Sequence, residues 1–103
     1  MAKLKMVAIG TLQTIEKNNP EMDFTKWSWR KKYEGFSGMI EVYQSIRIET
    51  DHHFILIYDK TQNWLKTGIG TVDCTDNITL TLTTDNSKYT FKIQKEIYRK
   101  DGE

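Results

Sequence analysis

The strongest constraint on this chain is the alternation of apolar and polar residues from 69 to 94, which predicts a three-stranded antiparallel meander. Thr84-Asp85-Asn86-Ser87 has the composition of a hairpin tip between the last two of these strands. That tip pairs apolar with apolar residues, namely Leu82 with Tyr89, Leu80 with Phe91 and Ile78 with Ile93.

A three-residue loop at Thr75-Asp76-Asn77 joins the first two strands and is expected to pair Cys74 with Ile78 and Val72 with Leu80. A slip of one residue would turn every apolar side chain of a strand toward water, so the faces are strongly specified. The expected inner face is Val72, Cys74, Ile78, Leu80, Leu82, Tyr89, Phe91 and Ile93. The outer face carries Thr79, Thr81, Thr83, Lys88, Thr90 and Lys92.

Two further segments can supply the layer against which this meander packs. Residues 4–15 alternate, with Leu4, Met6, Ala8, Gly10 and Leu12 on one side and Val7, Ile9 and Ile15 on the other. Both sides are apolar, which predicts a strand covered on both faces. Residues 39–50 are expected to form a long strand that turns at Asp51-His52 into a strand over residues 53–58. This register pairs Ile48 with Ile55 and Ile46 with Ile57.

The remaining segments carry mixed signals. Asn19-Pro20 can open a helix, but the even spacing of Trp27, Trp29 and Tyr33 favours a strand, and both readings of residues 20–34 stay open. Residues 34–38 are expected to form a turn or a bulge. Asp59 and Gln62 resemble a capping box, and Gly68 stands where a helix would end. They predict a short helical turn over residues 60–66, from which Trp64 and Leu65 could plug one end of the sheet.

Together these segments predict one all-β domain over residues 1–103, with residues 95–103 as a frayed tail. It would be an antiparallel meander sheet or a small β-barrel of about six or seven strands with one short helix. The length of 103 residues suits one domain. No apolar run is long enough for a signal peptide or a membrane helix, so no membrane partner is expected. The single cysteine fits a reducing compartment, and the expected location is the cytoplasm.

The sequence offers little support for catalysis or for a bound cofactor. Adjacent histidines such as His52 and His53 point to opposite faces of a strand and rarely bind one metal ion. Cys74 is expected on the apolar face, where it is a small core residue and not a nucleophile. Gly68-Ile69-Gly70 precedes a strand, whereas a phosphate-binding glycine loop opens a helix. We therefore expect a protein that is not an enzyme and holds no metal ion or cofactor.

Aromatic and basic residues between 24 and 58 are the candidate binding residues. A cluster of rings and cations can stack on bases and contact phosphates, but it can equally form a half-buried strand. The cluster consists of Trp27, Trp29, Arg30, Lys31, Lys32 and Tyr33. Tyr43, Arg47 and Tyr58 form a second set, of residue types enriched at the centres of protein interfaces. Phe54 either joins this second set or closes a barrel core together with Leu56.

The C-terminal stretch resembles an ending of small β proteins from phages and mobile elements of low-GC bacteria. The resemblance is carried by the segment from Trp64 to Val72 and by the hairpin from Thr83 to Phe91, which contains Asn86-Ser87-Lys88-Tyr89. It implies a small β domain from a mobile genome that binds and blocks a host protein in the host cytoplasm. It implies no catalytic residue.

The function expected from these observations is non-catalytic binding of a partner protein, with inhibition of a host protein as its consequence. One alternative is a small β-barrel that binds single-stranded nucleic acid, although a net charge of +1 gives no general attraction to phosphates. A second alternative is a structural or assembly component of a phage particle. An uncovered edge strand would also allow the chain to form a homo-oligomer.

Overall fold

The computed structural model describes residues 2–17, 32–45, 52–74, 76, 78–85 and 87–99, and these residues form strands and turns with no helix. The strands are β1 (Ala2–Lys17), β2 (Ser37–Ser45), β3 (His52–Tyr58), β4 (Trp64–Lys66), β5 (Gly70–Cys74), β6 (Thr79–Thr83) and β7 (Ser87–Arg99). The predicted all-β class is therefore confirmed for the described part of the chain. The segment from residue 95, expected as a tail, belongs to β7 as far as Arg99.

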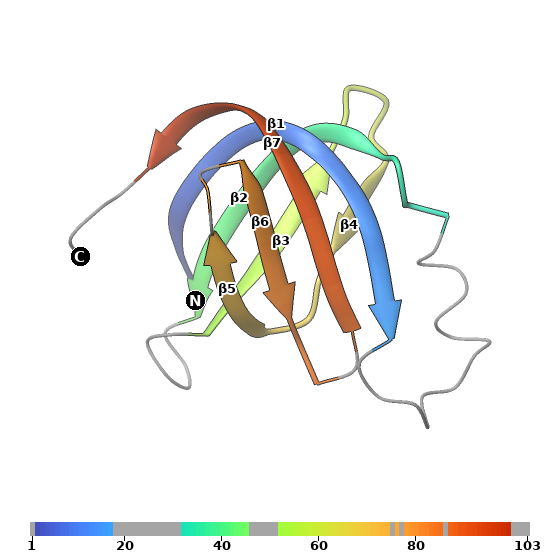
Figure 1. The fold of residues 1–103 in the computed structure, drawn as a ribbon. Helices are drawn as coiled ribbons and strands as arrows, with labels where there is room; N and C mark the ends of the chain where they lie inside the picture. Colours follow the sequence, from blue (N-terminus) through green and yellow to red (C-terminus); the bar gives the residue numbers. More distant parts are fainter. Residues whose placement is uncertain are drawn as a thin grey trace.

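All strand pairs are antiparallel, in the order β2-β1-β7-β6-β5-β3-β4, and β2 also pairs with β3. The pairings therefore return to the strand from which they start, and the sheet closes on itself (Figure 1). β4 and β5 share one edge of β3, where β4 pairs with residues 56–58 and β5 with residues 52–53. Closure gives the sheet an inner face, which holds the core, and an outer face.

The meander is present as β5, β6 and β7, and its last hairpin has the predicted register, with Leu82 opposite Tyr89 and Leu80 opposite Phe91. The first hairpin is shifted by two residues, because Val72 lies opposite Leu82 and Cys74 opposite Leu80. A shift of two leaves the faces unchanged, since side chains alternate with a period of two. The predicted faces are thus correct and the predicted β5–β6 register is wrong.

The longer β5–β6 connection is stabilised by the Asp76 carboxylate. Its Oδ1 accepts hydrogen bonds from the backbone N–H groups of Ile78, at 3.0 Å, and Thr79, at 2.7 Å. Because of this turn, Ile78 and Thr79 do not pair with β5, as the predicted register required. Ile78 still pairs with β7, since its carbonyl accepts the N–H of Ile93 at 2.6 Å, but its side chain is 48% exposed. The prediction of Ile78 as a core residue is wrong because β5 does not extend far enough to cover it.

The core fills the inside of the closed sheet with side chains from six of the seven strands. It consists of Met6, Ala8, Leu12, Ile15, Ile40, Val42, Ile55, Ile57, Leu65, Leu80, Leu82, Tyr89, Phe91 and Ile93. Tyr33, Phe36, Val72 and Cys74 are partly buried and pack against it. Tyr89 and Phe91 are the largest fully buried side chains, with their ring centroids 6.5 Å apart.

β1 shows how bulges change which residues enter the core. Met6, Ala8 and Leu12 alternate inward as predicted, but the β1–β7 register shifts between Leu12 and Thr14. The extra residue reverses the alternation, so Ile15 is fully buried instead of lying on the outer side. Ile9 remains on the outer side and is 37% exposed, so the prediction that β1 is covered on both faces is wrong.

The hairpin of β2 and β3 is present, but its register differs from the predicted one. Ile40 lies opposite Ile57 and Val42 opposite Ile55, which replaces the expected pairing through Ile46 and Ile48. The connection between these strands is therefore longer than a two-residue turn. Residues 46–51 lie outside the described residues, as do residues 18–31, where the choice between strand and helix was left open.

The predicted helical turn over residues 60–66 is wrong, because these residues form a tight turn followed by β4. Asp59 does accept backbone hydrogen bonds, from Thr61 at 2.9 Å and Asn63 at 3.2 Å, but within a hairpin. Gln62 adopts a left-handed φ of 68°, which no helix would allow. Asp59 therefore stabilises a turn, as its position in the sequence indicates. The residues that follow form a strand and not a helix because they pair with the edge of β3. Leu65 enters the core as expected of a plug, whereas Trp64 is 59% exposed.

Candidate functional site

The outer face of β1, β2, β3 and β4 carries three rows of opposed side chains, most of them aromatic or aliphatic. Directly opposed residues of antiparallel strands point to the same face, so each row continues from strand to strand. The rows are Leu4–Tyr43–Phe54, then Val7–Glu41–Leu56–Lys66, and then Ile9–Met39–Tyr58–Trp64. We call these eleven residues the aromatic face. Tyr98, which lies opposite Val7 and is 45% exposed, extends it onto β7.

Glu41 organises the middle of the aromatic face. The hydroxyl of Tyr43 donates to its Oε1 at 2.5 Å, and the hydroxyl of Tyr58 donates to its Oε2 at 2.6 Å. One carboxylate therefore holds two phenol rings from neighbouring strands in fixed orientations. The hydrogen bond to Glu41 is the largest cause that raises the pKa of Tyr43 to about 12, and it also raises the pKa of Tyr58. Both phenols consequently remain protonated donors well above neutral pH.

A stack of rings continues the face toward the other end of β3. The rings of Tyr43 and Phe54 lie 5.1 Å apart with an angle of 13° between their planes. The ammonium group of Lys66 lies 5.0 Å from the centre of the Phe54 ring. Cation–π and ring-stacking contacts of this kind are each worth about 0.5–1.5 kcal/mol, so they order side chains that could otherwise rotate freely.

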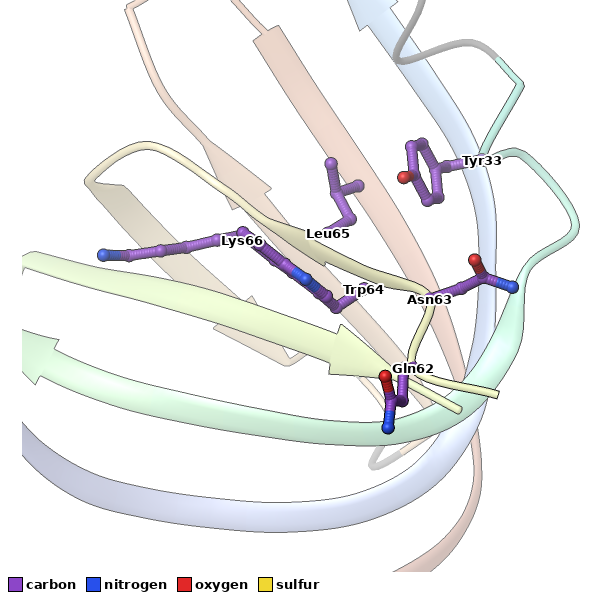
Figure 2. Close-up of a pocket in the computed structure, with 6 residues that line it drawn as sticks. All are labelled: Tyr33, Gln62, Asn63, Trp64, Leu65 and Lys66. Atoms are coloured by element: carbon purple, nitrogen blue, oxygen red, sulfur yellow. The ribbon is translucent and has the colours of Figure 1, made fainter. Parts of the chain in front are cut away.

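The aromatic face is hollowed at its end near the β3–β4 turn. A depression of about 500 Å³ is lined there by Ile9, Ser37, Gly38, Met39, Tyr58, Asp59 and Lys60. A second depression, of about 380 Å³, borders β4 on its other side and is lined by Tyr33 and residues 62–66 (Figure 2). Residues of the aromatic face therefore line both concave regions: Ile9, Met39 and Tyr58 line the first, and Trp64 and Lys66 the second.

The structure places some of the predicted binding residues and leaves others undescribed. Tyr43 and Tyr58 lie together on the aromatic face, as does Phe54, while the core positions go to Ile55 and Ile57. Trp27, Trp29, Arg30, Lys31 and Arg47 lie outside the described residues.

Lys32 and Tyr33, the last two residues of the predicted cluster, do not point into a common surface. Lys32 is exposed in a turn, whereas Tyr33 is partly buried against the core, with its ring 5.7 Å from that of Phe36. The turn over residues 32–35 includes Gly35 at a φ of 88° and overlaps the turn expected at residues 34–38, of which Ser37 and Gly38 belong instead to β2.

Sequence reasoning missed several members of the aromatic face. Trp64 was predicted to lie in a helix that would plug the sheet, and Glu41 was not among the predicted binding residues. Ile9 and Met39 gave no signal, because an apolar residue on an apolar strand is usually a core residue. Leu56 alternates with Ile55 and Ile57, so the sequence shows that it faces away from them but not which face is buried.

The two histidines considered for metal binding line different depressions, and one of these depressions also contains Cys74. His52 lines a depression between β5 and the β6–β7 turn, while His53 lines a different, smaller one together with Cys74 and Arg99. Cys74 is a half-buried free thiol. Among the described residues, no three His, Cys, Asp or Glu side chains lie close enough together to hold a metal ion.

A scan against protein-family models and searches of curated proteins and solved structures find no match to this chain. Nor does any helix among residues with a described position have the length and hydropathy needed to cross a membrane.

Proposed function

We propose that this chain is a small non-catalytic binding protein that docks on a partner protein through its aromatic face. The observation that carries the proposal is the set of aligned rings and aliphatic side chains on the outside of a closed sheet whose core is already filled. Trp64, Tyr98 and Ile9 expose 59%, 45% and 37% of their surface, although burying them would be favourable. Large apolar side chains that are aligned on one outer face mark an interaction site more often than a scattered distribution does.

The dimensions of the aromatic face suit the centre of a protein interface. Four strands spaced about 4.8 Å apart span roughly 14 Å, and four residue steps along β2 span roughly 13 Å, which gives about 200 Å². A stable interface buries about 800 Å² on each partner. The face is therefore large enough for the few aromatic anchors that dominate binding energy, with a polar surround completing the contact.

Its rigidity supports the same function. Glu41 accepts hydrogen bonds from the phenols of Tyr43 and Tyr58, and the Phe54 ring contacts the Tyr43 ring and the Lys66 ammonium group. Side chains that are ordered before binding lose less conformational entropy when the partner arrives. The stretch over which β6 and β7 pair offers a contrast, since its outer face carries Thr79, Thr81, Thr83, Lys88, Thr90 and Lys92.

A protein partner fits this surface better than a nucleic acid, because the carboxylate of Glu41 stands in the middle row and would repel phosphates. The resemblance of the C-terminal hairpin to proteins of phages and mobile elements suggests a host protein as the partner, and inhibition as the outcome of binding. A structural role in a phage particle would use the same face between copies of one chain.

Affinity capture from a host lysate with matched surface variants tests the proposal. Trp64→Ser combined with Ile9→Ser removes two exposed anchors, while Lys88→Ser combined with Lys92→Ser changes the outer face of β7 and is the control. We expect one protein to be recovered by the wild type and the control but lost with the anchor variant. Equal recovery by all three, or no recovery by the wild type, would contradict the proposal.

Titration with a single-stranded oligonucleotide at low salt separates the main alternative. Quenching of tryptophan fluorescence that weakens steeply with salt would replace the protein partner by a nucleic acid. A defined homo-oligomer in light scattering that the anchor variant dissociates would instead favour the structural role.

A further inference from the structure

β4 is the last strand in the sheet order, and within the described residues it pairs with β3 alone. Two hydrogen bonds, one before and one after β4, show which residues of β4 use their backbone groups to bind β3. Asp59 N–H donates to the Asn63 carbonyl at 3.1 Å, and Thr67 N–H donates to the Ile55 carbonyl at 2.9 Å. Hydrogen-bonded pairs of an antiparallel ladder recur at every second residue, so Leu65 uses its backbone groups to bind β3.

The backbone groups of Trp64 and Lys66 consequently point away from β3. Each residue presents one N–H and one C=O at the free edge of the sheet, which amounts to the pairing capacity of a further strand. A strand edge of this kind is a template for an extended peptide, whose own backbone supplies the complementary donors and acceptors.

The 380 Å³ depression lies beside this edge. It is lined by Tyr33, Gln62, Asn63, Trp64, Leu65 and Lys66. Figure 2 shows Leu65 and the Tyr33 ring on the same side of β4, with Lys66 projecting away along the sheet. An added strand would thus find the partly buried ring of Tyr33 for its inward side chain. Its outward side chains would have two exposed neighbours, Trp64 and Lys66.

We infer that the free edge of β4 binds an extended acidic segment of the partner protein by strand addition. The segment's backbone pairs with Trp64 and Lys66, and its apolar side chain enters the depression opposite Leu65. Its acidic character follows from the exposed, positively charged Lys66 on the edge. The inference rests on the proposed function for the partner being a protein, since Trp64 and Lys66 also end two rows of the aromatic face.

A short blocked peptide of alternating glutamate and valine is the probe, and its lysine–valine counterpart is the charge control. With the isotope-labelled full chain, we expect the acidic peptide to shift the amide signals of Trp64 and Lys66 and to slow their hydrogen exchange. The Leu65 amide already bonds to β3, so its exchange should change much less. Amides of Trp64 and Lys66 that do not respond at millimolar peptide, or that respond equally to the basic peptide, would overturn the inference.

Two substitutions at one position separate the backbone contact from the charge. Lys66→Gln removes only the charge, whereas Lys66→Pro also removes the outward N–H, which β3 does not use. We expect Lys66→Pro to bind the peptide roughly three- to tenfold more weakly than Lys66→Gln, the value of one net hydrogen bond. Equal affinities would contradict strand addition. Lys92→Ser, on the outer face of β7 and outside the aromatic face, should leave peptide affinity unchanged. Partner capture that depends on Ile9 and Trp64 without any peptide binding would overturn this inference and leave the proposed function standing.

Discussion

Thr67 offers a stringent test of how the closed sheet is held together. Its backbone N–H donates to the Ile55 carbonyl at 2.9 Å, and its Oγ1 accepts the Ile55 N–H, also at 2.9 Å. A side-chain hydroxyl thus replaces a backbone carbonyl at the point where the partner of β3 changes from β4 to β5. The same hydroxyl donates to the Gly68 carbonyl at 2.9 Å, and Thr67 is only 4% exposed.

Thr67→Val keeps the shape of the side chain and removes both hydroxyl contacts. The Ile55 N–H then remains buried without an acceptor, which costs about 1–3 kcal/mol. Gly68 is exposed, so its carbonyl can turn to water and adds little to this cost. We therefore expect the free energy of unfolding to fall by about 1–3 kcal/mol, which lowers the urea midpoint by about 1 M for a chain of this size.

Thr67→Ser is the matched control because it retains the hydroxyl and loses one methyl group, worth about 0.8 kcal/mol. Urea denaturation should rank wild type above Thr67→Ser and Thr67→Ser above Thr67→Val. Hydrogen exchange of the Ile55 amide should accelerate in Thr67→Val alone. If Thr67→Val proves as stable as Thr67→Ser, the hydroxyl does not complete the ladder and the reasoning fails.

Three further predictions concern the aromatic face and its strands. Glu41→Gln should lower the pKa of Tyr43 from about 12 toward 10, as measured by ¹³C NMR of the tyrosine rings. The folded wild type holds the phenol proton more tightly than the unfolded chain does, so its free energy of unfolding should fall as pH rises from about 10 to 12, and that of the variant should fall less. An unchanged pKa would exclude Glu41 as the cause. Phe54→Leu should cost about 0.5–1.5 kcal/mol in urea denaturation through loss of the stack with Tyr43, whereas Phe54→Tyr should cost less; equal costs would mean that the ring contributes nothing. Gly38→Ala should lower the free energy of unfolding by more than about 2 kcal/mol, because a Cβ there overlaps the carbonyl group of Tyr58. Gly68→Ala should not, because the nearest atom to its Cβ is Thr84 Cγ2 at 3.9 Å, and thermal melts of both variants test the difference.

Much of the fold follows from local patterns in the sequence. Leu80, Leu82, Tyr89 and Phe91 alternate with threonine and lysine, so their common face is determined by the period of a strand. The last hairpin is also predictable in register, because its short tip leaves few ways to pair. For β5 and β6 the same alternation fits two registers, and the Asp76 turn selects the longer connection.

The candidate site was less predictable, for a physical reason visible in β3. The segment Phe54-Ile55-Leu56-Ile57-Tyr58 is apolar on both faces, so its period shows which residues share a face but not which face is inside. Closure of the sheet decides this by placing Ile55 and Ile57 opposite Val42 and Ile40 within the core.

By itself, the sequence determined the all-β class, the meander and the division of β3, β6 and β7 into two faces, because these depend on periods and turns that act over a few residues. Only the tertiary structure decided the rest: which edges meet, that residues 64–66 become a strand and not a helix, and that Glu41 lies between two tyrosines. Those outcomes depend on backbone hydrogen bonds between segments far apart in the chain. A strand edge that needs a partner outweighs the weak helical preference of a few residues, and no local pattern records where that edge will be.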